Sequence, residues 1–252
     1  MVKKGGKAHL KRLLAPHFWR IPKKGAVWAA RPTPGPHSKD ASIPLVVILR
    51  YILNYAYTAK EARRIITEGN IEVDGKIRRN PRFSVGLMDV VEIPETNDSF
   101  RALPAPKRGL VLHHIKKSET KFKLCRIENK TCTKGGHIQL NLHDGRNYLI
   151  KLADPHNPAE DVYKVHEVIM LSLPKQEVKD HIKLEEGVIA LTIAGKNLGL
   201  VGKIEKIERG SALYPSIVTL KGNDDISFQT LLKYVFPIGA EKPLISLPEA
   251  ST

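Results

Sequence analysis

Apolar and polar positions change their spacing along residues 43–94, and the change predicts two short helices followed by short strands. At the start of this stretch, apolar residues recur at three- and four-residue steps, which is typical of a helix with one buried face. Pro44 suits the first turn of that helix, because a proline there has no N–H group to leave unpaired. The apolar face consists of Leu45, Ile48, Leu49, Ile52 and Leu53.

A second helix is predicted from Thr58 to Gly69. Thr58 and Glu61 have the three-residue spacing of a capping box, and Gly69 tolerates the left-handed conformation that ends many helices. The helical period divides the remaining residues between two faces. The expected inward positions are Ala59, Ala62, Ile65 and Ile66. The expected outward positions are Lys60, Arg63, Arg64 and Thr67.

The period changes to two after this helix. Residues 71–77 predict a hairpin that turns at Asp74 and Gly75, and residues 85–93 predict a closing strand. A run of cations follows the hairpin directly: Arg78, Arg79 and Arg82. Arginine on a short, capped platform favours forked hydrogen bonds to phosphate, although a basic helix face is often only solvated. Because two basic segments fall within one small unit, we favour RNA as its partner.

Together these segments resemble the alpha-L RNA-binding motif. Certain ribosomal proteins, pseudouridine synthases and tyrosyl-tRNA synthetases share that motif. The resemblance implies binding to structured RNA, but it does not separate a scaffold protein from an enzyme. It is carried by Thr58–Ile66, Gly69, Ile71, Val73–Lys76, Gly86, Asp89 and Val90.

Strand patterns dominate the chain after a proline-rich stretch at residues 100–107. That stretch contains Pro104 and Pro106, and it marks the first interior domain boundary. Asp144 and Gly145 predict a hairpin turn. Alternation of apolar and polar residues predicts strands over residues 122–127, 137–142, 147–152 and 163–173. These segments predict a compact, β-rich module.

A further unit lies between residues 183 and 222. Residues 188–193 predict a buried strand, and residues 203–207 predict another. The turn between them carries Lys196 and Asn197 and is punctuated by glycines, which permit positive φ and close backbone approach. The stretch 187–204 resembles a KOW motif on a small SH3-like barrel, although any glycine-turned hairpin has a similar pattern. The glycines are Gly195, Gly199 and Gly202.

The charge of the chain is uneven. Its 252 residues carry a formal net charge of +15. Residues 1–120 hold 23 Lys and Arg against 10 Asp and Glu, a balance of +13, whereas the rest hold 18 against 16, a balance of +2. We therefore expect the front half of the chain to face a polyanion.

Residues 1–42 form a basic arm with no acidic residue before Asp40. Its closely spaced prolines exclude a long helix, and we expect the arm to be extended or ordered mainly by its partner. Phe18, Trp19 and Trp28 lie among its cations. Their rings either stack on exposed bases or pack on the adjacent domain, and the sequence leaves both alternatives open.

Chemistry other than binding has little support. Cys125 and Cys132 match neither a disulfide framework nor a zinc knuckle, even with histidines nearby in the sequence. No phosphate-binding loop, nucleophile elbow or His-Glu-x-x-His pair occurs. No stretch approaches the ~18 apolar residues of a membrane span, and no signal peptide is indicated. We expect a soluble, cytosolic protein without catalytic residues, metal, cofactor, membrane contact or small-molecule substrate.

Taken in order, the segments resemble the S4e family of archaeal and eukaryotic small-subunit ribosomal proteins. Residues 9–12 and 31–37 of the arm and the closing residues 243–248 extend the resemblance beyond the alpha-L and KOW patterns. The resemblance implies a non-catalytic component of the 30S-type subunit, bound to small-subunit ribosomal RNA and to neighbouring ribosomal proteins. The absence of long extensions favours an archaeal source.

The expected fold is α+β and has several modules. It comprises a basic N-terminal arm (1–42), a small α/β alpha-L RNA-binding unit (43–100), a β-rich central domain (101–175) and a KOW SH3-like β-barrel with a C-terminal tail (176–252).

We expect cations of the arm, the alpha-L unit and the KOW turn to bind RNA through shape and phosphate placement. The candidate residues are Lys3, Lys4, Lys7, Lys11, Arg12, Arg20, Lys23, Lys24, Arg31, Lys60, Arg63, Arg64, Lys76, Arg78, Arg79, Arg82, Lys196, Asn197 and Lys203. One alternative is an RNA-binding factor that works away from the ribosome. Another is an RNA-modifying enzyme that the alpha-L unit targets, although two small β-rich modules leave little room for a catalytic domain.

Overall fold

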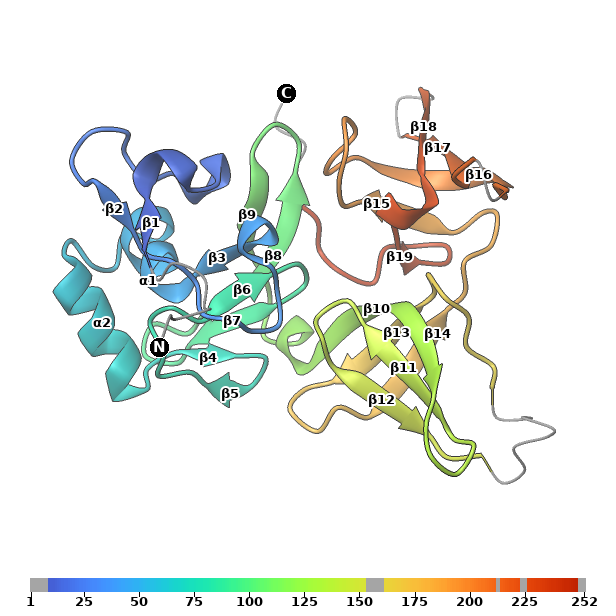
Figure 1. The fold of residues 1–252 in the computed structure, drawn as a ribbon, viewed down its shortest axis with the longest axis horizontal. Coiled ribbons are helices and arrows are strands. Elements are labelled where there is room, and N and C mark those ends of the chain that lie inside the picture. The colour runs from blue at the N-terminus through green and yellow to red at the C-terminus, as the bar shows by residue number, and fades with distance from the viewer. Residues whose placement is uncertain (1–8, 153–160, 212–213, 223–225, 249–252) are drawn as a thin grey trace, which may run out of the picture. The chain divides into compact units, whose positions relative to one another are not determined.

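The computed structural model describes residues 9–152, 161–211, 214–222 and 226–248 (Figure 1). The chain divides into two compact units: unit 1 contains Met1–Ala102 and Leu110–His114, and unit 2 contains Leu103–Gly109 and Ile115–Thr252. The predicted α+β class is confirmed, with many strands and few helices in the described ranges. Within those ranges, no helix has both the length and the apolar character that a membrane crossing requires.

Both predicted helices are present in unit 1. The first, α1 (Leu45–Val47), continues into a π-helical turn, Ile48–Ile52. Leu45, Ile48 and Leu49 of the predicted apolar face are buried, and Ile52 and Leu53 are half-buried. Pro44 lies one residue before this helix, in an extended conformation, instead of inside the first turn. The reason is that strand pairing holds residues 42–44 extended up to the start of α1.

The second helix, α2 (Ala59–Glu68), begins at the predicted capping box. The hydroxyl of Thr58 accepts a hydrogen bond from the backbone N–H of Glu61 at 3.2 Å, and the carboxylate of Glu61 accepts one from the backbone N–H of Thr58 at 3.2 Å. Gly69 ends the helix with a φ of 98°, in the left-handed region. The faces divide as expected, because Ala62 and Ile66 are buried.

Short strands complete unit 1. The hairpin of β4 and β5 turns at Asp74 and Gly75, as predicted. The larger sheet has the order β5-β4-β7-β8-β9, while β1 pairs with β2 and β3 pairs with β6, both antiparallel. The strands are β1 (Leu10–Lys11), β2 (Trp28–Ala29), β3 (Ser42–Pro44), β4 (Glu72–Val73), β5 (Lys76–Ile77), β6 (Ser84–Gly86), β7 (Val90–Ile93), β8 (Asp98–Ala105) and β9 (Gly109–His114), although residues 103–105 of β8 and Gly109 of β9 are assigned to unit 2.

One strand prediction in this region needs correction, and the proline-rich stretch proves to be mostly strand. The single closing strand expected over residues 85–93 is divided into β6 and β7, because the chain turns at Met88, whose φ is 63°. The proline-rich stretch at residues 100–107 is mostly strand, since β8 continues through Pro104 to Ala105. A proline is tolerated in a strand where its missing N–H is not needed by a neighbour.

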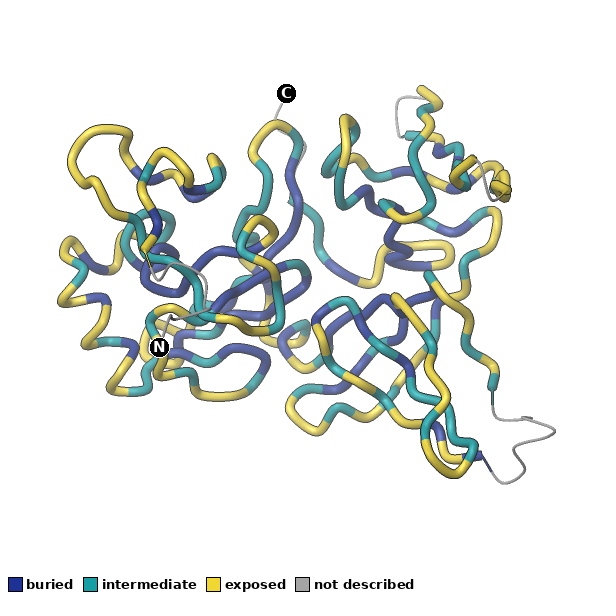
Figure 2. The backbone as a smooth tube through the Cα atoms, viewed as in Figure 1, coloured by how far each residue is buried: buried dark blue, intermediate teal, exposed yellow. Residues whose placement is uncertain are grey.

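The basic arm is folded from residue 9 onward, which corrects the prediction that it is extended or ordered mainly by its partner. Trp19 is fully buried, and its indole N–H donates a hydrogen bond to the carbonyl of Ser42 at 2.7 Å. Leu10, Ala15 and Ile21 are buried in the same core as α1. The apolar residues of the arm thus pack on the apolar core of unit 1. Burial of their side chains offsets the entropy cost of ordering the segment. Figure 2 shows the loop before β2 exposed, whereas Ile21 before it is buried and residues 29–33 after it are half-buried.

A buried contact joins the end of the arm to the alpha-L unit. The Nε2 atom of His37 lies 3.0 Å from the carboxylate of Asp89, and both side chains are almost completely buried. Asp89 also accepts a hydrogen bond from the backbone N–H of Gly86 at 2.8 Å. A Cβ atom at Gly86 would lie 2.2 Å from the ring of His37, so only glycine leaves room for this contact.

In the described part of the chain, unit 2 contains two five-stranded sheets. Their orders are β12-β11-β10-β13-β14 and β18-β17-β16-β15-β19, and all of the recorded pairings in them are antiparallel. The strands of the first sheet are β10 (Phe122–Cys132), β11 (Ile138–Leu142), β12 (Asn147–Ile150), β13 (Val168–Ser172) and β14 (Val178–Ile182). The strands of the second are β15 (Ile189–Thr192), β16 (Val201–Glu208), β17 (Ile217–Lys221), β18 (Ser227–Leu231) and β19 (Val235–Gly239).

The first sheet of unit 2 buries a group of charges beside its apolar core. The ammonium of Lys123 lies 2.9 Å from the carboxylate of Asp144, and each side chain is only 1% exposed. The guanidinium of Arg146 lies 3.1 Å from the same carboxylate. Burial by itself raises the pKa of Asp144, but the charges of Lys123, His143 and Arg146 together lower that pKa below its usual range.

Candidate nucleic-acid interface

The cations on the exposed face of α2 differ in whether an acidic side chain pairs with them. Lys60, Arg63 and Arg64 all lie on the exposed side, as predicted. The guanidinium of Arg64 donates a hydrogen bond to the carboxylate of Glu68 at 2.8 Å, and that bond raises the pKa of Arg64. In the described part of the chain, the side chain of Arg63 makes no such hydrogen bond to a carboxylate. Arg63 therefore offers a full charge to a ligand, whereas the charge of Arg64 is partly balanced.

The segment after the hairpin adds cations next to the end of α2. Lys76, Arg79 and Arg82 are exposed. A Cβ atom placed at Gly69 would lie 3.5 Å from the guanidinium of Arg79, so this side chain extends along the C-terminus of α2. Arg78 is half-buried, with its guanidinium 4.5 Å from the ring centroid of Phe83. It contributes less to the free charge than the predicted set implies.

The arm and this segment are bound to each other. The backbone N–H of Thr33 donates a hydrogen bond to the carbonyl of Arg82 at 2.9 Å, and the side-chain amide of Asn80 donates one to the hydroxyl of Thr33 at 3.3 Å. Asn80 also accepts a hydrogen bond from the backbone N–H of Arg82 at 3.0 Å. These bonds hold Thr33 of the arm against Asn80 and Arg82 of the alpha-L unit.

The predicted cations of the arm fall into four groups. Lys11, Arg20, Lys23 and Lys24 are exposed, and Arg31 is half-buried. Arg12 instead donates a hydrogen bond through its Nε atom to the carbonyl of Ile21 at 2.9 Å, so it holds the fold of the arm. Three predicted residues lie outside the described residues: Lys3, Lys4 and Lys7.

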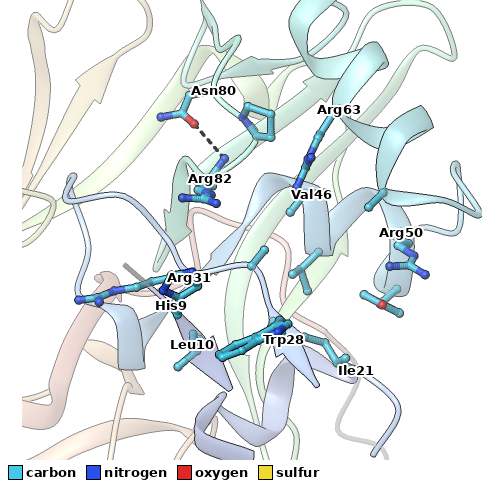
Figure 3. A pocket seen from close by; sticks show the side chains of 16 residues that line it. His9, Leu10, Ile21, Trp28, Arg31, Val46, Arg50, Arg63, Asn80 and Arg82 are labelled. Carbon is cyan, nitrogen blue, oxygen red and sulfur yellow. Dashed lines mark hydrogen bonds between the residues drawn. The ribbon is translucent and has the colours of Figure 1, made fainter. Parts of the chain in front are cut away.

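A pocket of about 430 Å³ opens on unit 1 where the arm meets the alpha-L unit (Figure 3). Four arginines from separate segments line it, together with the exposed ring of Trp28. No acidic residue is among the sixteen residues, all within the described ranges, that form its wall. The arginines are Arg31, Arg50, Arg63 and Arg82.

The lining residues that reasoning from the sequence missed include His9, Arg50 and Asn80. Arg50 is the single cation in the apolar run 45–53, and this isolated charge is the signal that could have identified it. His9 and Asn80 carry no comparable signal, because each becomes part of the pocket only through contacts between distant segments.

The three predicted residues between positions 183 and 222 belong to unit 2 and form a separate set. Lys196 and Lys203 are exposed. Asn197 uses its side-chain amide to donate a hydrogen bond to the carbonyl of Gln229 at 3.0 Å. It therefore fixes the turn, and the two lysines are the groups that face solvent.

Three family models match the chain in succession. The RS4NT (NUC023) domain matches residues 4–40, the S4 domain matches residues 43–91, and the Ribosomal family S4e model matches residues 96–178. The S4 domain covers α1, α2 and the hairpin and includes the exposed cations of α2 and of residues 76–82, whereas the RS4NT match includes the exposed cations of the arm.

Full-length relatives agree with these matches. The chain is 51% identical to small ribosomal subunit protein eS4 of Staphylothermus marinus over 100% of both chains. It is 51% identical to the protein of the same name from Desulfurococcus amylolyticus over 98% of both chains. The crystal structure of the 30S ribosomal protein S4e from Thermoplasma acidophilum superimposes with a TM-score of 0.65 at 33% identity, covering 80% of this chain and 97% of that chain.

Proposed function

Because the chain belongs to the S4e family of ribosomal proteins, we propose that it is a structural constituent of the small ribosomal subunit and binds small-subunit ribosomal RNA. The single observation that carries this proposal is the 51% identity to small ribosomal subunit protein eS4 along the whole chain. The role is structural and not enzymatic. The protein works in the cytoplasm as part of the ribosome, beside neighbouring small-subunit proteins.

The RNA-binding surface that we propose lies on unit 1. Exposed cations of the arm, of α2 and of the segment after the hairpin supply phosphate contacts, and capping and backbone hydrogen bonds hold them in fixed positions. Such a surface recognises the shape of folded RNA, because A-form helices hide their base edges in a deep groove. The residues proposed for direct contact are Lys11, Arg20, Lys23, Lys24, Arg31, Lys60, Arg63, Arg64, Lys76, Arg79 and Arg82.

We also propose that the second sheet of unit 2 is the SH3-like barrel of a KOW module. Two of its glycines support this assignment, since each allows close backbone approach. A Cβ atom would lie 2.6 Å from the backbone of Pro106 at Gly199 and 2.7 Å from the carbonyl of Lys221 at Gly202. The four parts proposed for the chain are then 1–42, 43–100, 101–175 and 176–252. Lys196 and Lys203 make a smaller, additional RNA contact.

Crosslinking in cells, followed by sequencing of the attached RNA, tests the function directly. We expect crosslinks from the arm and from Arg63 at one site on small-subunit ribosomal RNA. Binding to that RNA should weaken steeply as salt increases, because each phosphate contact releases counterions. Crosslinks spread over many transcripts or transfer RNAs, or a salt dependence near zero, contradict the proposal.

A further inference from the structure

The lining of the pocket of unit 1 combines buried apolar residues with cationic side chains. Leu10, Ile21 and Val46 form part of the wall, and all three are buried residues of the unit 1 core. The volume of about 430 Å³ lies in the range of roughly 300–1,000 Å³ that small-ligand pockets occupy. A phosphate group alone has no need of an apolar wall. The ligand should therefore combine an apolar, flat part with negative charge.

An aromatic side chain is available on this pocket. Trp28 is 56% exposed although it lies in a strand, and its side chain lines the cavity. The ring of His9 lies 5.3 Å from the ring of Trp28, centroid to centroid, at an angle of 52°, and so supports it from one side. Burying a tryptophan normally stabilises a fold, and the exposed position of Trp28 contrasts with complete burial of Trp19 nine residues earlier.

Cations surround this ring without acidic partners. Figure 3 shows Arg63 and Arg82 on the side of the pocket opposite Trp28, with Arg31 at its rim. Within the described ranges, the side chains of these three arginines make no ion pair. The fourth arginine, Arg50, is held by other contacts of the fold. Its Nε atom donates a hydrogen bond to the carbonyl of Tyr57 at 2.9 Å, and its guanidinium lies 4.7 Å from the ring centroid of Tyr51. The pocket therefore has three free guanidinium groups and one that is held in place.

We propose that this pocket receives a single unpaired nucleotide of the bound RNA, with its base on the ring of Trp28 and its phosphates among Arg31, Arg63 and Arg82. The inference rests on the proposed function, because it takes the bound polyanion to be ribosomal RNA. A paired base cannot enter a cavity of this kind, since it is held inside a helix. Bases in loops and bulges are free to turn outward and stack on aromatic side chains.

Tryptophan fluorescence of the full-length protein tests the inference. The chain contains two tryptophans, of which Trp19 is fully buried and Trp28 is exposed, so acrylamide should quench mainly Trp28. On titration with small-subunit ribosomal RNA, we expect the emission of Trp28 to fall and the remaining emission to become protected from acrylamide. A Trp28→Phe variant reports the signal of Trp19 alone and serves as the spectroscopic reference.

Substitutions measure what the stacking contributes to binding. Trp28→Ala should weaken RNA binding roughly five- to 150-fold, the range that stacking of one base on an aromatic ring supplies, while Trp28→Phe retains most of the affinity. Tyr57→Ala is the matched control, because Tyr57 is an aromatic residue of the same unit that is 90% exposed and does not line the pocket. It should change binding less than twofold.

The possible outcomes separate this inference from the function on which it rests. If the RNA binds but the emission of Trp28 does not change, and Trp28→Ala binds as well as Tyr57→Ala, the pocket holds no base and the ribosomal function stands. If Trp28→Phe binds as weakly as Trp28→Ala, stacking is also the wrong explanation. If the wild-type protein does not bind small-subunit ribosomal RNA, the proposed function and this inference are both overturned.

Discussion

Units 1 and 2 use their positive charges differently. In unit 1, Arg63, Arg79 and Arg82 are exposed, and the described part of the chain gives them no acidic partner. In unit 2, Lys123 is buried against Asp144, and Lys130 is paired with Asp161. The first arrangement leaves charge available to a polyanion, and the second consumes charge within the fold.

This difference explains why the number of cations is a poor guide to RNA binding. The front half of the chain has 23 Lys and Arg and the back half has 18, which are similar numbers. The halves differ more in how many cations are already neutralised. A count over the sequence detects the net balance, but only the contacts show which individual cations are free.

Breaking the buried pair of unit 2 should have the largest effect. Lys123→Met leaves the carboxylate of Asp144 buried without its nearest cation, which should lower the free energy of unfolding by about 3–5 kcal/mol. Far-UV circular dichroism in urea follows the strands of both units, whereas fluorescence follows unit 1 alone, because both tryptophans lie there. We expect the urea midpoint measured by circular dichroism to fall and the midpoint measured by fluorescence to stay unchanged.

A matched control uses the same substitution at an exposed pair. The ammonium of Lys206 lies 2.8 Å from the carboxylate of Glu208 on the surface of unit 2. Lys206→Met should leave both midpoints nearly unchanged, since exposed pairs contribute little to stability. An equal loss of unfolding free energy in the two variants would show that the buried pair of Lys123 stabilises the fold no more than an exposed pair does.

Gly86→Ala should have the next largest effect, and it should appear in unit 1. The new methyl group would lie 2.2 Å from the ring of His37, and overpacking of this kind typically costs about 1–3 kcal/mol. The fluorescence midpoint in urea should fall. Gly222→Ala is the control, with both variants also followed by far-UV circular dichroism because Gly222 lies in unit 2; the nearest atom to its new methyl group is 3.5 Å away. A Gly86→Ala variant as stable as the control would disprove the steric role of this glycine.

The buried pair of Lys123 and Asp144 in unit 2 also predicts that stability depends on pH. Because the pKa of Asp144 is lowered in the folded protein, the charged carboxylate stabilises the fold at every pH above its ordinary pKa of 3.8. That contribution is lost as the pH falls through the lower pKa of the folded state. The stability advantage of wild type over Asp144→Asn, from urea titrations at several pH values, should be constant down to about pH 4 and then shrink. An advantage that disappears between pH 7 and pH 5 would contradict this assignment.

Single cations of unit 1 should each make a smaller contribution, visible in RNA binding. Arg63→Ala should reduce the slope of log affinity against log salt by about 1, because one phosphate contact is lost. Arg64→Ala should reduce it less, since Glu68 already balances part of that charge. Filter binding to small-subunit ribosomal RNA at several salt concentrations measures both. A larger change for Arg64 than for Arg63 would reverse the proposed roles.

The smallest effect is expected from the cations of the turn in unit 2. Replacing Lys196 and Lys203 together by alanine should lower the salt slope by less than the single Arg63→Ala change. Their removal leaves the turn intact, because the hydrogen bond of Asn197 to the carbonyl of Gln229 remains. A loss greater than that of Arg63→Ala would move the main RNA contact to unit 2.

Local features of this protein were predictable from its sequence. The capping box joins residues three apart, and the hairpin turn needs only Asp74 and Gly75, so a short stretch contains all of the information for each. The outward position of Arg63 follows from the period of α2 in the same way. The family resemblance adds the order of these segments along the chain.

Features that depend on distant partners were not predictable. Trp19 is 23 residues away from the carbonyl that its indole contacts, so its burial could not be read from the composition of the arm. Lys123 alternates with apolar residues as a solvent-facing lysine would, yet its partner Asp144 is also the first residue of a predicted turn. The pattern identified the turn correctly and gave no indication that its carboxylate is buried. Strands with polar positions on both faces, such as Val178–Ile182, were missed for a similar reason.

The contact of His37 with Asp89 has a consequence for the order of events during synthesis. The arm is made first, but strand β3 pairs with β6, and the imidazole of His37 needs a carboxylate 52 positions further along the chain. A nascent chain shorter than about 90 residues therefore has no means of closing this loop. The basic residues of the arm and those of α2 acquire their final spacing only when residues 84–89 have left the exit tunnel. Tight RNA binding should accordingly begin after that point of translation, and not when the first cations emerge.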